Sequence, residues 1–335
     1  MKITVLGAGT WGVALATLLI KNAHEVTLWS ALPEELCELK ETKRQKNLPG
    51  MTVPEEIIYE ADIKTAISGA EMVLFVVPSS FVRSTARLAA PFIKDGMIVV
   101  NAAKGIESGT LMTMTEIIDD ELKRVNSELQ VHIAALSGPT HAEEVARGLP
   151  TSIVSACENE ETSLKIAKVF FNSCMRVYTN TDVLGVEISG AFKNIIALAA
   201  GMNKGMGFGD NSNAMLMTRG IAEITRLGLA MGCKRRTFMG LAGIGDLIVT
   251  CTSVHSRNNR CGELIGKGLS YDEASKEIGM VVEGYHALEA AMELSKKYEV
   301  ELPITEAVYA VVKKGLSVKE GMLALMNRNI KSELD

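Results

Sequence analysis

The sequence lacks the patterns that mark metal enzymes, secreted proteins and membrane proteins. Its six cysteines form no C-x-x-C pair and its five histidines form no H-E-x-x-H motif, so we expect reduced thiols and no metal site. We find no run of 18 apolar residues that would span a membrane, and Met1-Lys2 leads straight into an apolar strand instead of a signal peptide. These absences predict a cytoplasmic protein.

An excess of basic residues is also missing. The net charge of −5 and the pI near 5.7 argue against nonspecific nucleic-acid binding, so locally placed basic groups must hold any anionic ligand. With 335 residues, 47% hydrophobic and 22% charged, the chain is expected to bury a sizeable core and to form two domains.

The first 30 residues contain a dinucleotide-binding pattern. A short apolar strand over residues 3–6 enters Gly7-Ala8-Gly9-Thr10-Trp11-Gly12, a helical pattern follows, and residues 25–29 predict a second strand. In this G-x-G-x-x-G context, glycines permit a tight turn and the helix N-terminus receives a pyrophosphate. We therefore predict that Gly7, Gly9 and Gly12 bind a dinucleotide.

The end of the second strand does not choose between NAD and NADP. Ser30 and Ala31 follow it directly, the first carboxylates are Glu34 and Glu35, and no Arg or Lys lies close by. An acid at this point would select the ribose 2′-hydroxyl of NAD. The cofactor stays open as NAD or NADP.

Apolar strands alternate with helical patterns up to about residue 180. We predict further strands over residues 72–77, 97–100, 132–136, 152–156 and 176–178. Ligands bind at the carboxyl ends of the strands in such mostly parallel sheets. The Gly7 turn, the Pro78 turn, Lys104 and the turn at 138–140 should therefore border one crevice.

Helical periodicity then takes over, and we divide the chain into a dinucleotide-binding domain, 1–184, and a helical substrate domain, 185–335. Residues 182–203 predict a long buried helix in which Glu187, Lys193 and Asn194 are the conspicuous polar positions. A buried lysine needs a reason, because an unpaired buried charge is costly. The alternatives are a functional lysine and one whose stem packs while its head reaches water.

Small residues share the face of this helix that carries Lys193. Gly190, Ala197 and Gly201 lie at helical spacing from it, so another group is able to approach the backbone closely.

The segments after this helix are richer in polar residues and glycine. Residues 201–213 predict a loop that either connects two helices or closes over a ligand, with the next helix capped at one of residues 210–212. Ser256 is expected to cap a later helix, where Arg257 and nearby amides would hold a phosphate or form a solvated turn. Residues 280–284 predict another turn, and residues from about 285 to 330 predict packing helices.

These motifs together closely resemble those of bacterial NAD(P)-dependent glycerol-3-phosphate dehydrogenases, over nearly the whole chain. The matching segments are GAGTWG at 7–12, AAKG at 102–105, LSGPTHAEEVARGLPT at 136–151, GAFKN at 190–194, LAGIGDLIVTCTS at 241–253, SRN at 256–258 and VVEG at 281–284. The resemblance implies an α/β Rossmann-type N-terminal domain followed by an all-α C-terminal domain of the 6-phosphogluconate-dehydrogenase-like kind. It also implies reversible conversion of dihydroxyacetone phosphate and sn-glycerol 3-phosphate, which supplies phospholipid synthesis.

The resemblance also implies roles for individual residues. Besides the three glycines, the cofactor-binding positions are Thr10, Trp11, Lys104, Ala142, Arg257, Val281 and Glu283. The substrate-binding positions are Lys104, Gly138, Thr140, Lys193, Asp246, Ser256, Arg257 and Asn258. Lys193 matches the proton acceptor of the family, with Lys104 and Asp246 as the other catalytic candidates.

Departures from the family pattern are modest. Ser30-Ala31 stands where relatives often place a basic or imidazole side chain, Thr140-His141 replaces Ser-Phe, and Phe192 replaces Leu.

In the expected mechanism, Lys193 exchanges a proton with the C2 oxygen of the substrate. A free lysine titrates near 10.4, so we expect burial, and Lys104 if it is near, to lower the pKa of Lys193. Asp246 would orient Lys193 or bind a substrate hydroxyl, and Arg257 would bind the phosphate. The alternatives are a ketopantoate or hydroxy-acid dehydrogenase of similar architecture and a non-catalytic dinucleotide-sensing regulator. We expect a homodimer with a small-molecule substrate.

Overall fold

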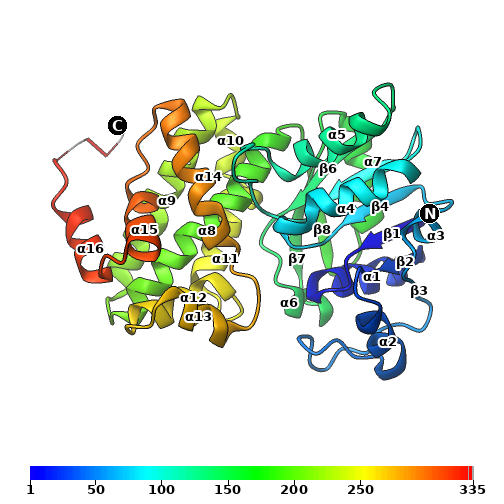
Figure 1. The fold of residues 1–335 in the computed structure, drawn as a ribbon, viewed down its shortest axis with the longest axis horizontal. Helices are drawn as coiled ribbons and strands as arrows, with labels where there is room; N and C mark the ends of the chain where they lie inside the picture. The colour runs from blue at the N-terminus through cyan, green and yellow to red at the C-terminus, as the bar shows by residue number, and fades with distance from the viewer. Residues whose placement is uncertain (331, 334–335) are drawn as a thin grey trace. The chain divides into compact units, whose positions relative to one another are not determined.

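The computed structural model describes residues 1–330 and 332–333. It divides into two compact units (Figure 1), the first formed by Met1–Gly190 with Arg236–Asp246 and the second by Ala191–Arg235 with the chain from Leu247 onward. Each unit is described separately below.

The first unit is built on an eight-stranded sheet in the order β3-β2-β1-β4-β5-β6-β7-β8. The strands are β1 (Lys2–Leu6), β2 (Glu25–Trp29), β3 (Ile58–Glu60), β4 (Met72–Phe75), β5 (Ile98–Asn101), β6 (His132–Ser137), β7 (Thr151–Ala156) and β8 (Met175–Asn180). Neighbouring strands run parallel except β6 and β7. The predicted mostly parallel sheet is confirmed. Strand β3 was not predicted, because a three-residue edge strand carries no continuous apolar run.

Helices cover both faces of this sheet. They are α1 (Thr10–Lys21), α2 (Pro33–Thr42), α3 (Ile63–Ile67), α4 (Val82–Ala89), α5 (Met114–Val125), α6 (Ala142–Ala146) and α7 (Glu160–Phe170), with 3-10 turns at Ser79–Phe81 and Ala90–Phe92. Successive strand residues enter opposite cores: Leu74 packs with α1 and α7, whereas Phe75 packs with α4 and α5. Burial on both faces explains why β4 and β5 are apolar nearly throughout.

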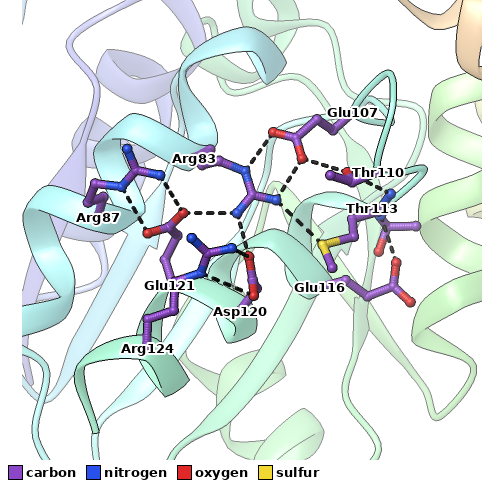
Figure 2. Close-up of polar contacts among 10 residues, drawn as sticks. Arg83, Arg87, Glu107, Thr110, Thr113, Glu116, Asp120, Glu121 and Arg124 are labelled. Atoms are coloured by element: carbon purple, nitrogen blue, oxygen red, sulfur yellow. Dashed lines mark hydrogen bonds and ion pairs between the residues drawn. The ribbon is translucent and has the colours of Figure 1, made fainter.

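Helices α4 and α5 are also joined by a cluster of charged side chains (Figure 2). The Arg83 guanidinium donates to the carboxylates of Glu107, Asp120 and Glu121, at 2.6, 2.5 and 2.9 Å. Hydrogen bonds from Arg83 hold the pKa of Glu107 and of Asp120 below their ordinary values, and bonds from Arg87 and Arg83 do the same for Glu121. This cluster fixes the helical layer on one face of the sheet.

The remaining helices belong wholly or partly to the second unit. They are α8 (Val183–Gly205), α9 (Asp210–Ala230), α10 (Arg235–Phe238), α11 (Asp246–Thr252), α12 (Arg257–Gly266), α13 (Tyr271–Ile278), α14 (Glu283–Tyr298), α15 (Pro303–Lys314) and α16 (Val318–Met326). A π-helical turn of the first unit, η3 (Leu241–Gly245), precedes α11. Helix α8 starts in the first unit and continues into the second. An all-helical C-terminal part follows the sheet, as predicted.

The small residues of α8 allow another helix to approach its backbone. A Cβ at Gly201 would lie 2.0 Å from the carbonyl oxygen of Asn259, and a Cβ at Gly262 would lie 2.1 Å from the carbonyl oxygen of Leu198. Glycine at these positions therefore permits the close packing of α8 against α12.

The predicted loop over residues 201–213 is wrong. Helix α8 continues to Gly205 and α9 begins at Asp210 with Gly209 as its N-cap, so the capping residue expected at 210–212 is wrong as well. The glycines at 201 and 205 looked like signals of flexibility, but both positions face backbone atoms of α12. Tertiary packing therefore outweighs their low helix propensity.

By length and composition alone, helix α8 is long and apolar enough to cross a membrane. A second candidate span results only if residues 235–252 and 257–266, which are bent relative to each other by 48°, are taken as a single span. The apolar window of α8 is 89% buried inside the protein. Among the described residues, α8 is thus a core helix.

Candidate functional site

The glycine-rich turn between β1 and α1 leaves no room for side chains at two of its positions. Gly7 has φ +125°, and a Cβ there would lie 2.7 Å from the carbonyl oxygen of Val76, while a Cβ at Gly12 would lie 1.9 Å from the carbonyl oxygen of Gly7. Helix α1 starts after Gly9 with no side-chain cap and no acidic residue in its first turn. Its N-terminal N–H groups are therefore suited to a phosphate group.

The side chains around this turn are held by neighbouring elements. The Thr10 hydroxyl accepts a hydrogen bond from the Asn47 amide at 3.2 Å. Trp11 and Ala142 are half-buried against the same apolar cluster as α1. Trp11 and Ala142 thus pack against one apolar cluster, and Thr10 precedes Trp11 in the first turn of α1.

A carboxylate lies at the end of β2. Ser30 is buried, its hydroxyl donates to Glu35 at 2.8 Å, and it accepts from the backbone N–H of Leu32 at 3.1 Å. The acid that the strand itself lacks is therefore supplied by the first turn of α2.

The predicted convergence of four turns at the carboxyl ends of the strands is confirmed. The Lys104 ammonium, after β5, donates to the Gly138 carbonyl, after β6, at 3.2 Å. A Cβ at Gly105 would lie 2.4 Å from Cβ of Ser79, after β4, and Gly7 contacts the backbone of Val76. Strands β1, β4, β5 and β6 are consecutive parallel neighbours, so their ends lie side by side.

Lys104 has a buried carboxylate partner. Its ammonium lies 2.7 Å from Asp246, whose side chain is 1% exposed, and the Lys104 side chain is itself only 19% exposed. The Thr140 hydroxyl donates to the Gly138 carbonyl at 3.2 Å. Sequence reasoning proposed both charged residues without pairing them, because 142 positions separate them along the chain.

One hydroxyl near Lys104 was missed by sequence reasoning. Ser137 Oγ is buried without a hydrogen-bond partner among the described residues, and a Cβ at Gly190 would lie 3.3 Å from it and 3.4 Å from Cγ of Lys104. The only signal in the sequence is its place at the end of a strand, before Gly138.

In the second unit, Lys193 is buried rather than extended to water. It is 6% exposed and its ammonium donates to the Thr250 hydroxyl at 2.8 Å. The alternative in which the head of this lysine is solvated is therefore wrong. Thr250 was missed, although it lies within a family motif four residues after Asp246.

Asn258 lies between two helices of the same unit. Its amide nitrogen donates to Asn194 Oδ1 at 2.9 Å, and its Oδ1 accepts from the backbone N–H of Gly284 at 2.9 Å. A Cβ at Gly284 would lie 2.5 Å from the Asn194 carbonyl oxygen. The asparagine thereby fixes the start of α14 against α8.

Ser256 is the N-cap of α12, as predicted, because its hydroxyl accepts from the backbone N–H of Asn259 at 3.2 Å. Arg257 follows as the first residue of the helix and its side chain is exposed. Val281 and Glu283, at the start of α14, are half-buried. A guanidinium beside helix N–H groups is a suitable phosphate ligand.

Within the described part of the chain, no group of three or more His, Cys, Asp or Glu side chains is arranged to hold a metal ion. All six cysteines are free thiols.

Comparison with known proteins matches both parts of the chain to one family. Residues 2–163 match the family model of the NAD-dependent glycerol-3-phosphate dehydrogenase N-terminus, and residues 182–323 match that of the C-terminus. Glycerol-3-phosphate dehydrogenase [NAD(P)+] 2 of Lactobacillus delbrueckii subsp. bulgaricus is 59% identical over 99% of this chain and 99% of its own length.

Solved structures agree with this match. The crystal structure of glycerol-3-phosphate dehydrogenase from Coxiella burnetii is 34% identical, with a TM-score of 0.92 over 98% of this chain and 99% of that one. A ketopantoate reductase from Ralstonia eutropha has a TM-score of 0.61 over 96% of this chain and 100% of that one, but at 18% identity it shows the fold alone. The chain therefore belongs to the NAD-dependent glycerol-3-phosphate dehydrogenase family of oxidoreductases.

Proposed function

We propose that this protein reversibly transfers a hydride between dihydroxyacetone phosphate and sn-glycerol 3-phosphate, with NAD or NADP as cofactor, and supplies glycerol 3-phosphate for phospholipid synthesis. The observation that carries the proposal is Lys193, a buried lysine with a hydroxyl partner, in a chain whose other unit has a dinucleotide fold. A buried ammonium is suited to proton exchange with a substrate oxygen.

The residues present fit the cofactor. The turn at Gly7 and Gly12 is a cradle that a Cβ would fill, and the uncapped start of α1 offers N–H groups to its pyrophosphate. Thr10, Trp11, Lys104 and Ala142 of the first unit, with Arg257, Val281 and Glu283 of the second, would complete the binding set. The nicotinamide supplies the hydride chemistry when it is bound.

The protein's own side chains would position the substrate and move its proton. Lys193 would exchange the proton with the C2 oxygen. Ser256, Arg257 and Asn258 would bind the phosphate, so that binding energy positions the reacting carbon. Gly138, Thr140 and the Lys104–Asp246 pair would hold the rest of the three-carbon chain.

We infer that both lysines act on one substrate. The family supports this, because Lys104 and Lys193 both fall on substrate-binding positions of glycerol-3-phosphate dehydrogenases. Within its own unit each lysine is held by a side-chain partner, Lys104 by Asp246 and Lys193 by Thr250.

We also propose a division of the sequence at residue 184, with a dinucleotide-binding domain over 1–184 and a substrate domain over 185–335, although the compact units divide after Gly190 and add Arg236–Asp246 to the first. The separate family models, which end at 163 and begin at 182, support it. A cytoplasmic homodimer is proposed from the family resemblance, and sedimentation equilibrium would give either 36.1 kDa or twice that mass.

The direct test follows the oxidation of NADH and of NADPH, in separate assays, after dihydroxyacetone phosphate is added to the purified protein. Rapid oxidation with either cofactor supports the proposal. Turnover with ketopantoate or another keto acid instead would replace the substrate, and cofactor binding without any turnover would favour a regulator.

Replacing the buried lysine tests the mechanism. Lys193→Met should lower kcat by about 10²-fold or more, because removing a general acid–base group typically costs about 10²–10⁴-fold, while NADH still binds. The matched control is Lys204→Met on the same helix, whose side chain is 59% exposed and pairs with Glu263. Similar kcat values for the two variants would reject the role of Lys193.

A further inference from the structure

A second polar residue of α8, Glu187, is fully enclosed in the first unit. It is 6% exposed and lies six residues before Lys193, in the part of α8 that belongs to the sheet-containing unit. No step of the mechanism above uses it. A carboxyl group in such a position must be held by hydrogen bonds, since burying it unpaired is costly.

The partners of Glu187 stand at the two ends of one loop. This loop, residues 102–113, connects β5 to α5 and carries Lys104. Glu187 Oε1 accepts from the side-chain amide of Asn101, the last residue of β5, at 3.1 Å. The same oxygen accepts from the backbone N–H of Thr115, in the first turn of α5, at 3.0 Å, and Thr115 Oγ1 donates to Oε2.

Asn101 extends this contact toward Lys104. Its Oδ1 accepts from the backbone N–H of Ala103 at 3.0 Å, and its Nδ2 donates to the Ala103 carbonyl at 2.9 Å. Ala103 directly precedes Lys104, whose ammonium bonds to Asp246 and Gly138. A continuous series of hydrogen bonds therefore runs from Glu187 to the backbone that carries Lys104.

We propose that Glu187 is a positioning residue: by closing the base of the 102–113 loop through Asn101 and Thr115, it aims the Lys104 ammonium at the substrate. The inference rests on the proposed role of Lys104 in binding that substrate. Glu187 itself touches neither substrate nor cofactor in this assignment. Displacement of a positioned group by about 1 Å is enough to cost about 10²-fold in rate.

The charge of Glu187 is not what positions the loop. Burial raises the pKa of Glu187 to about 7, against the opposing effect of the bonds from Thr115, and Glu116 of α5 is a charged group near it. The bonds to Asn101 and to the Thr115 N–H both end on Oε1. Protonation of Oε2 leaves them in place, because the Thr115 hydroxyl can turn to accept.

The test compares Glu187→Leu with Glu187→Gln. Leucine has a side chain of similar size but no hydrogen-bond acceptor. We therefore expect kcat with dihydroxyacetone phosphate to fall about 10²-fold and KM to rise. The dissociation constant of NADH, measured by fluorescence, should stay within about threefold, because the glycine turn that would hold the pyrophosphate is unchanged and Lys104 is one of many groups in the cofactor-binding set. Glutamine retains an acceptor oxygen in the place of Oε1, so it should recover most of the loss and show the pH profile of the parent enzyme.

A buried glutamate in the second unit provides the matched control. Glu223, on α9, is 4% exposed and accepts from the backbone N–H groups of Ile304 and Thr305 at the start of α15. Glu223→Leu should lower stability as much as Glu187→Leu does, without changing kcat per folded molecule. If Glu187→Leu does not fold, Asn101→Leu interrupts the same series of bonds and should give the same separation of kcat from NADH binding.

Two outcomes would overturn the positioning role. One is a Glu187→Leu enzyme with kcat and KM within about threefold of the parent. The other is a loss in Glu187→Leu that adds fully to the loss in Lys104→Met, since residues that act through each other are not additive. Parent-like turnover by Lys104→Met alone would instead overturn the proposed role of Lys104, so the two failures are distinguishable.

Discussion

At the scale of single residues, the end of β2 shows how one hydroxyl fixes the position of a nearby carboxylate. Ser30 is buried and holds the Glu35 carboxylate just after β2, the strand at whose end a Rossmann domain commonly presents an acid to the ribose 2′-hydroxyl. A carboxylate there repels the 2′-phosphate of NADPH. We therefore predict a preference for NADH, a choice that Ser30 and Ala31 left open in the sequence.

Removing this carboxylate should shift the cofactor preference. In Glu35→Ala, the ratio of kcat/KM for NADPH to that for NADH should rise about tenfold, equivalent to about 1.4 kcal/mol. Steady-state assays with both cofactors measure the ratio. Glu34→Ala, the exposed neighbour in the same helix turn, is the control, and equal ratios in the two variants would show that Glu35 does not face the ribose.

At the scale of elements, the contact of α8 with α12 depends on glycine more than on side-chain shape. Gly201 and Gly262 each face a backbone carbonyl of the opposite helix at a distance that excludes a Cβ. Backbone atoms cannot move aside as the end of a flexible side chain can. This pairing holds in place the segment of α8 that follows Lys193.

A methyl group at this contact should separate the two helices. Gly201→Ala should lower the free energy of unfolding by at least about 2 kcal/mol, within the range for overpacked cores, as measured by urea denaturation. Gly209→Ala is the control, because a Cβ at Gly209 meets nothing within 4 Å and its φ is −88°. The control should lose less than about 1 kcal/mol, and equal losses would contradict the packing argument.

At the scale of the whole molecule, carboxyl groups affect stability in opposite directions. The groups bonded to Arg83 have lowered pKa values, so their contribution is present above the unfolded-state pKa and is lost as the pH falls in acid. Burial raises the pKa of Glu187 and of Glu223 to about 7. Between about pH 4.5 and 7 the folded state binds these protons more tightly, so stability falls as the pH rises.

Replacing one buried carboxyl should flatten this dependence. Glu223→Gln keeps an acceptor for Ile304 but cannot ionise, so it should remove a decline of about 3 kcal/mol between pH 5 and 8. Urea midpoints at several pH values in this range measure the slope. The control is Glu273→Gln, at an exposed helix cap where hydrogen bonds from Ser270 lower the pKa of the Glu273 carboxyl; this variant should keep the parent slope. An unchanged slope in Glu223→Gln would show that Glu223 does not titrate between pH 5 and 8.

Local patterns in the sequence determined much of this protein. The glycine turn, the apolar strands, the long helix around Lys193 and the cap at Ser256 follow from backbone conformation and from the spacing of apolar residues. Those properties depend on residues a few positions apart, so they can be predicted from the sequence alone. The family motifs then identified the cofactor class and the substrate.

Tertiary structure decided what depends on residues far apart in the chain. It set β7 antiparallel to β6, continued α8 through glycines that resembled a loop, paired Lys104 with Asp246 and enclosed Glu187 between Asn101 and Thr115. The free energy of each contact comes from desolvation and hydrogen bonding between groups that only the fold brings together. Sequence reasoning can identify such residues, but tertiary packing determines which partners they contact.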